Sequence, residues 1–162
     1  MITPDLTSFP VNIINALAVE MNKIDDDLEV LKRPLRTGDP IQCIGITAAL
    51  WTPDEESYEF DGGFPGAPTV NTYTIAIQVF NQDMDQERGL ATNSTLANLV
   101  RRRLSSNMDV RVALTLLENT TNGVTERYKR SGVPTQRFLT NEIEGSFLFM
   151  SNLEFFVETE IQ

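Results

Sequence analysis

The chain has 162 residues, of which 41% are hydrophobic and 22% charged, a composition typical of one globular domain. Its 13 basic and 23 acidic residues give a net charge of -10 at pH 7, which disfavours binding to nucleic acid or anionic membranes unless the cations are gathered into one patch. Histidine is absent, so Ser-His-Asp and Cys-His catalysis and histidine metal sites are excluded.

Cysteine usage and hydropathy indicate a protein made and folded in a cytoplasm. Cys43 is the only cysteine, so no disulfide can form within the chain, and its apolar surroundings predict a buried, unreactive thiol. No apolar run approaches the ~20 residues of a membrane span, and the N-terminus lacks the pattern of a signal peptide. We therefore expect neither a membrane nor an oxidising compartment.

The first predicted element is an amphipathic helix that Ser8 caps and that begins at Pro10. Its apolar residues recur at spacings of three and four and end before Pro34: Ile13, Ile14, Leu17, Met21, Ile24, Leu28 and Leu31. The acidic run 25–27 is where this helix could break. We interpret these aspartates as a solvated turn or a helix start rather than a binding site.

Two strands are predicted next, at 41–51 and at 70–80, with the odd-numbered residues of the second facing the core. Between them, residues 54–68 are first acidic and then rich in glycine and proline, which is long for a loop in a compact domain. Trp51, Tyr58, Phe60 and Phe64 lie in or beside this stretch. We interpret it as a contact loop, and carbohydrate stacking on its aromatic residues is the less favoured alternative.

A second helix is predicted from Asp83, as its cap, to about Ser105, with Gln86 completing an approximate capping box. Its apolar stripe consists of Leu90, Leu96, Ala97, Val100 and Leu104. Asp83, Asp85 and Glu87 resemble the start of a calcium loop. The sixth position lacks glycine and the twelfth lacks glutamate, so we assign these acids to the helix N-terminus instead.

The last third of the chain reads as extended. Residues 110–117 alternate, with Val110, Val112, Leu114 and Leu116 predicted on one face of a strand. Asn122-Gly123 favours a tight turn that folds residues 124–129 back on this strand, followed by a short extended piece near Phe138. The order of elements predicts an α+β domain with a mostly antiparallel sheet, an N-terminal helix and a central helix packed on it.

The final strand, from Ser146 to Ile161, is the clearest element. Its apolar face carries Phe147, Phe149, Leu153, Phe155, Val157 and Ile161, and its polar face carries Asn152, Glu154, Glu158 and Glu160. Sixteen residues at roughly 3.3 Å each exceed the usual strand length. We therefore expect a bend near residues 151–152, a crossing to a second sheet or a contact with a neighbour, and full cover for residues 146–150. This is a first hint of a building block rather than an enzyme.

Catalytic, cofactor-binding and metal sites are not expected. The acids at 54–59 lie in a polar loop without sign of the raised pKa that a paired-carboxylate mechanism needs, and no phosphate-binding glycine motif occurs. The cations are concentrated in the run Arg101, Arg102 and Arg103. Other cations that could join this cluster in the fold are Arg111, Arg127, Lys129, Arg130 and Arg137. These cations complement a helix dipole, or they pair with the acidic loop of an identical copy arranged head to tail.

Four stretches together resemble the tail terminator proteins of long-tailed, siphovirus-type bacteriophages, particularly those that infect actinobacteria. They are residues 38–40, the apolar strand with Gly45, the segment 51–59 and the strand 68–80. The order of elements agrees over nearly the whole chain. The resemblance implies a virion protein, assembled in the host cytoplasm, whose ring of commonly six subunits caps the tail tube, stops its polymerisation and joins it to the head connector.

DNA would pass through such a ring without specific contacts, and six copies at -10 each would carry a charge of -60, which does not retain phosphate. The resemblance thus implies as partners further copies of the chain, the tube protein and the connector protein, with lysine and arginine at subunit boundaries. Two alternatives stay open. One is another neck or connector protein of the virion, and the other is a monomeric carbohydrate- or protein-binding module that uses the aromatic loop.

Overall fold

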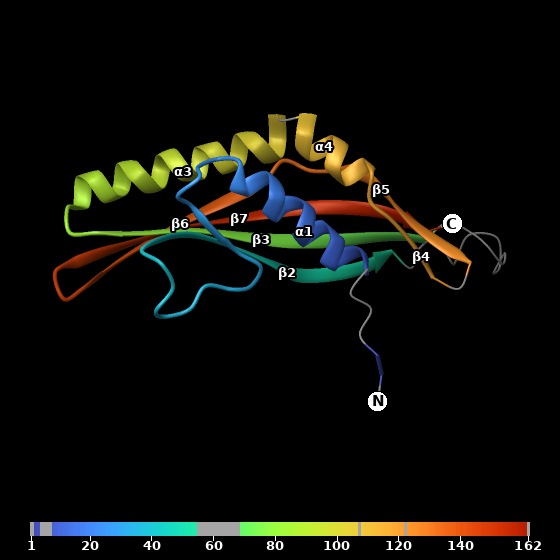
Figure 1. The fold of residues 1–162 in the computed structure, drawn as a ribbon, viewed down its shortest axis with the longest axis horizontal. Helices are drawn as coiled ribbons and strands as arrows, with labels where there is room; N and C mark the ends of the chain where they lie inside the picture. The colour runs from blue at the N-terminus through green and yellow to red at the C-terminus, as the bar shows by residue number, and fades with distance from the viewer. Residues whose placement is uncertain (1, 4–7, 55–68, 107, 122, 162) are drawn as a thin grey trace.

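A computed structural model describes residues 2–3, 8–54, 69–106, 108–121 and 123–161 (Figure 1). Its helices are α1 Phe9–Asn22, α3 Gln86–Ser106 and α4 Met108–Thr115. Its strands are β1 Glu29–Leu31, β2 Gln42–Asp54, β3 Thr69–Asp83, β4 Glu118–Thr121, β5 Val124–Ser131, β6 Thr135–Ile143 and β7 Ser146–Ile161. They form one sheet in the order β1-β2-β3-β7-β5-β4, and β6 also pairs with β7. Only β1 and β2 pair in parallel, so the predicted α+β fold with a mostly antiparallel sheet is confirmed.

The terminal strand has the predicted bounds and the predicted alternation. Phe149, Leu153, Phe155 and Val157 are buried, because the odd-numbered side chains of β7 and β3 face the helices. The length of β7 does not force a bend, a crossing to a second sheet or a contact with a neighbour. β3 is long enough to pair with β7 from Phe147 to Ile161 without a register shift. The length of β7 is therefore no evidence of assembly. Within a single copy only Phe149 of residues 146–150 is buried, so the chain by itself does not provide the full cover expected for this stretch.

Residues 124–161 form one long hairpin, which the sequence analysis did not foresee as a unit. β5 and β6 pair with successive parts of the same edge of β7, and they are separated at 132–134, where the Gly132 amide donates to the Phe156 carbonyl over 3.0 Å. At the tip, Glu144 and Gly145 adopt φ angles of 50° and 78°, the left-handed pair that a two-residue hairpin turn requires. We call the tip and its two strands, residues 135–150, the β6–β7 hairpin.

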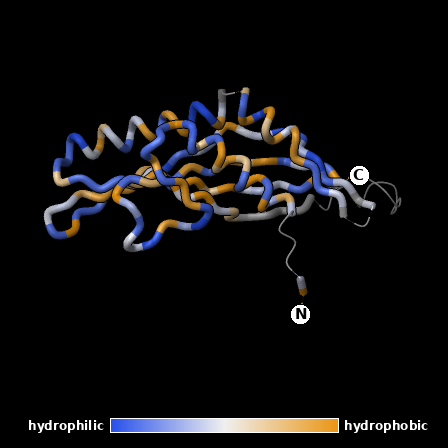
Figure 2. The backbone as a smooth tube through the Cα atoms, viewed as in Figure 1, coloured by the Kyte–Doolittle hydropathy of each residue, from blue (hydrophilic) through white to orange (hydrophobic). Residues whose placement is uncertain are grey.

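One hydrophobic core lies between the helices and the sheet. Figure 2 shows hydrophobic stretches along the central strands. The largest fully buried side chains are Phe9, Ile13, Leu17, Met21, Ile44, Ile46, Ile75, Ile77, Leu104, Leu114, Phe149 and Phe155. The predicted stripe of the second helix is confirmed at Leu96, Ala97, Val100 and Leu104, whereas Leu90 is exposed.

Several local predictions are corrected by non-local contacts. Residues 29–31 are not helical, because they pair with β2 as the short strand β1 after the break at 25–27. Residues 108–115 are the helix α4 rather than a strand, and the partner of β5 in the predicted hairpin is β4. Ser8 precedes α1 without a side-chain capping bond. Asp85, not Asp83, caps α3, since its Oδ1 accepts the Arg88 amide over 3.0 Å.

The segment 32–40 covers part of the sheet face opposite the helices. The Leu35 side chain lies so close to Gly45 that a Cβ there would be 2.8 Å from it, and the Leu35 amide donates to Gln78 Oε1 over 3.0 Å. Arg33 holds this segment by donating from Nη1 to Asp39 Oδ2 over 2.9 Å. Cys43 lies beneath it, fully buried as predicted, and burial raises the pKa of its thiol to about 11.

Candidate assembly surfaces

The outer strand of the long hairpin is exposed along its whole length. All nine residues of β6 are exposed, and no described residue pairs with its outer edge. Phe138, Leu139 and Ile143 leave 44%, 60% and 52% of their surface accessible to solvent. A long, exposed and partly apolar edge strand offers unpaired backbone groups to a partner, and soluble monomers usually protect such edges. The sequence predicts extended structure near Phe138, but no local pattern indicates that this strand is exposed.

Beside the β6–β7 hairpin, the sheet face opposite the helices contains a hollow of about 510 Å³. We call it the hairpin hollow. Its apolar walls come from Leu35, Phe80, Ile143, Leu148 and Met150, and Glu144 stands at the turn of the hairpin. This volume and this mixture of apolar walls and few charged groups fall within the range of protein binding sites.

A second apolar surface lies on α4. Val110 and Leu114 point into the core, as the i, i+4 spacing of a helix allows, and α4 contacts α1 and β5. Met108, Val112 and Leu116 leave 66%, 51% and 77% of their surface exposed. Leu116 continues the helical turn, because its amide donates to the Val112 carbonyl over 3.1 Å. We call these three residues the α4 stripe.

The arginines of the predicted cationic cluster have different roles. Arg103 is half-buried and donates from Nε to the Glu20 carbonyl over 2.9 Å, so it links α3 to α1. Arg101 and Arg102 are exposed near the end of α3, and Arg111 is exposed on α4. Of the ion pairs formed between described residues, none uses Arg101, Arg102 or Arg111. These three cations lie next to the α4 stripe along the chain.

The cations of β5, in contrast, already have acidic partners. Arg127 pairs with Glu118 over 3.1 Å, while Lys129 and Arg130 both pair with Glu158, over 3.4 and 2.8 Å. The predicted interface set is therefore not one cationic patch. Among the described residues, the members of this set without an ion pair lie near the junction of α3 and α4.

The aromatic part of the predicted interface is only partly described. Tyr58, Phe60 and Phe64 lie outside the described residues. Trp51 belongs to β2, where its backbone pairs with that of Tyr73. The contact-loop hypothesis for residues 54–68 therefore stays a prediction.

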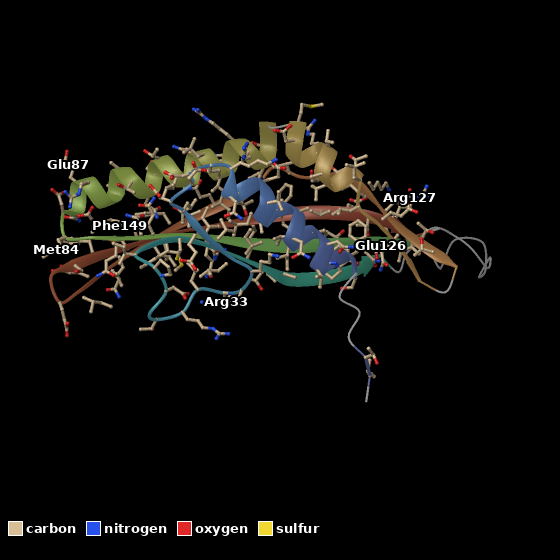
Figure 3. All side chains as sticks on the ribbon, viewed as in Figure 1. Arg33, Met84, Glu87, Glu126, Arg127 and Phe149 are labelled. Atoms are coloured by element: carbon tan, nitrogen blue, oxygen red, sulfur yellow. The ribbon has the colours of Figure 1, made fainter. Side chains whose placement is uncertain are left out.

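A polar cluster that the sequence analysis missed joins β5 to the centre of the sheet. Glu126 Oε1 accepts hydrogen bonds from Tyr73 Oη over 2.7 Å, from Thr159 Oγ1 over 2.6 Å and from Asn71 Nδ2 over 3.4 Å. Burial, together with the neighbouring Glu126 carboxylate, raises the pKa of Tyr73. Figure 3 labels Glu126 near the end of the sheet where the chain terminates, beside a hollow of about 470 Å³. No sequence signal could have joined these residues, since they come from three strands.

Within the described ranges, no helix is long and apolar enough to cross a membrane, and no group of three or more His, Cys, Asp or Glu side chains is placed to hold a metal ion. Asp83 forms an ion pair with Arg88 at the start of α3. This ion pair, together with hydrogen bonds from backbone amides, lowers the pKa of the Asp83 carboxyl to about 2.

No protein-family model matches the chain, and no curated protein matches it.

Proposed function

We propose that this chain is a structural subunit of a homo-oligomeric ring, the tail terminator of a siphovirus-type bacteriophage. The observation that carries the proposal is the exposed β6 strand, which presents apolar side chains on both faces in a domain that already has a complete core. Such a surface belongs in an interface between subunits, since soluble monomers rarely leave it open. The resemblance of the segments around Gly45 and Trp51 to terminator proteins supplies the biological context.

The charge of the chain is compatible with this role. Each copy carries -10, so a ring with DNA in its lumen would bind the passing phosphates weakly. In the proposed role the ring caps the tail tube at its head-proximal end, ends tube polymerisation and contacts the head connector. Neither catalysis nor a cofactor is needed, because assembly is the function.

Two measurements on the purified chain test the proposal. Six copies of the 18.2 kDa chain would give about 109 kDa in light scattering, together with rings in electron micrographs. Added to polymerising tube protein, the ring should shorten the tubes in proportion to its concentration. A monomer at micromolar concentration would contradict the ring and favour a monomeric binding module. A ring that leaves tube length unchanged would point to another neck protein of the virion.

A further inference from the structure

We infer that copies of this chain join head to tail, with the α4 stripe of one copy seated in the hairpin hollow of the next. The inference rests on the proposed function, which requires self-association but does not say which surfaces meet. Its basis is that two exposed surfaces, at separate places on the domain, are both apolar and have charges of opposite sign beside them.

The α4 helix is apolar on two opposite faces, and only one of them is covered. Its inner face, Val110 and Leu114, belongs to the core, while the α4 stripe on the outside stays exposed. A helix that is apolar all round is normally buried, so the outer face has the composition of an interface. The stripe follows the i, i+4, i+8 spacing with which a helix docks its anchors in a groove, and it extends over about 12 Å at 1.5 Å per residue.

The hairpin hollow provides the matching receptor. Phe80, Leu148 and Met150 are half-exposed side chains on the sheet face that the helices leave open, and Ile143 forms the wall at the hairpin. Met150 is unbranched and can adapt to an incoming side chain, as methionine does at other docking surfaces. Apolar side chains of the stripe would therefore be buried against apolar side chains of the hollow.

The charges next to the α4 stripe and at the hairpin tip are opposite. Arg101, Arg102 and Arg111 lie on the α3–α4 side, where Asp109 is the nearby acid, and they make no ion pair with a described residue. Glu142 and Glu144 lie exposed at the hairpin tip, while the far wall of the hollow carries Asp39, which pairs with Arg33, and the exposed Arg36. Because whole copies repel each other at -10 each, a local contact between arginine and glutamate would both orient the encounter and exclude other registers.

The two surfaces lie apart in the fold, so each copy offers two different surfaces to its neighbours. Figure 1 shows the tip of the β6–β7 hairpin at one end of the sheet, whereas α4 lies toward the other end. Where each copy contacts a different neighbour through each surface, the contact is heterologous, and the chain of contacts closes into a ring or continues as a filament. A twofold dimer in which each α4 stripe fills the other copy's hollow would satisfy the same contacts, and a parent mass of about 36 kDa in light scattering, from two chains of 18.2 kDa, would identify it and overturn the ring.

Complementary variants test the arrangement. Val112→Asp with Leu116→Asp disables the α4 stripe, and Leu139→Asp with Ile143→Asp disables the hairpin. All four side chains are more than half exposed, so the circular dichroism spectra should match that of the parent chain, and the thermal melts should match at a dilution where the parent is monomeric. Each double variant alone should be monomeric in light scattering, with association weakened about 30-fold or more. Val19→Asp, 58% exposed on α1, is the matched control and should assemble as the parent does.

Mixing the two variants gives the decisive result. Each retains one intact surface, so an equimolar mixture should form a one-to-one dimer of about 36 kDa, from two chains of 18.2 kDa, and stop there. On the charge side, Arg101→Glu with Arg111→Glu should weaken assembly about tenfold, and adding Glu142→Arg with Glu144→Arg to the same chain should restore it.

The outcomes separate this inference from the proposed function. If the parent chain forms a ring and both disabled variants still form it, the ring uses other surfaces, so the inference fails while the proposed function stands. If the α4 variant alone forms a dimer through the hairpin, the contact is between like surfaces, and head-to-tail docking is wrong. If the parent chain is monomeric, the proposed function fails first.

Discussion

Asn93→Ala should destabilise the fold more than any other single polar substitution in α3. Asn93 is fully buried, and its Nδ2 donates to the Val79 carbonyl over 3.1 Å and to the Phe149 carbonyl over 3.2 Å. Its Oδ1 accepts the Ser151 hydroxyl over 2.6 Å. One amide therefore joins α3 to both central strands. Figure 3 labels Phe149 in this region, under the first half of α3.

The expected cost follows from these three bonds. At about 1 kcal/mol of net stability each, their loss lowers the free energy of unfolding by about 3 kcal/mol. For a domain of this size the midpoint of thermal unfolding should fall by roughly 6–12 °C. Ser151→Ala removes one of the bonds and leaves the amide oxygen without its partner, so we expect about 1.5 kcal/mol. The double variant should cost about as much as Asn93→Ala alone, because the bond between the two side chains counts in both single variants.

Urea unfolding followed by circular dichroism measures these values. All variants are compared at one protein concentration, because self-association adds a concentration-dependent term. Asn98→Ala is the matched control, since Asn98 is exposed on the same helix and its loss should change stability by less than about 0.5 kcal/mol. A cost below about 1 kcal/mol for Asn93→Ala would refute the reasoning. So would additive costs in the double variant.

Three further predictions concern packing, pH and thiol chemistry. Gly89→Ala should cost about 1–3 kcal/mol in urea unfolding because its Cβ would clash with a buried phenylalanine ring, whereas Gly132→Ala, with its nearest neighbours 3.9 Å away, should be nearly neutral. Arg33 lowers the pKa of Asp39 to about 2, so Asp39→Asn should melt at a lower temperature than the parent at pH 6; that gap should shrink as the pH falls from about 4 through 2, and a gap independent of pH would count against the pairing. Cys43 should react with a thiol reagent at pH 8 far more slowly in the native protein than in urea, and rapid native labelling would contradict its burial.

The strands of the sheet centre could be predicted because their signal is local. Alternation with a period of two indicates β2, β3 and β7 wherever one face is buried. The observed bounds of β7, Ser146 and Ile161, are the predicted ones. The turn at Gly123 was equally readable, since its φ of 78° is the conformation that glycine adopts without strain. These features need only neighbouring residues for their recognition.

The helix α4 shows where local patterns are ambiguous. Val110, Val112, Leu114 and Leu116 alternate as a strand would, but Val110 and Leu114 are also four residues apart, as on a helix face. The strand period of two and the helix period of 3.6 both fit so short an apolar segment. Packing against α1 and β5 favours the helix. The same error hid the α4 stripe, because a strand would have placed all four side chains together.

Candidate interface residues were predictable in type but not in arrangement. The arginine run and the acidic balance are visible in the sequence, yet which arginines keep their charge uncompensated depends on whether Glu118 and Glu158 lie beside Arg127 and Arg130. That proximity arises from strand pairing between segments up to 28 residues apart. The exposure of Leu139 likewise depends on β6 being the outermost strand at that end of the sheet.

The sequence by itself determined the alternation of the long strands, the amphipathic faces of α1 and α3, the tight turn at Gly123 and the acidic charge, because each is a property of residues close together in the chain. Tertiary structure alone decided that residues 29–31 pair with β2, that 108–115 are helical, that both edges of β7 pair with strands of the same chain, and that apolar side chains remain exposed on α4 and β6. The physical reason is that burial and pairing depend on which distant segments meet, and local periodicity carries no information about that choice.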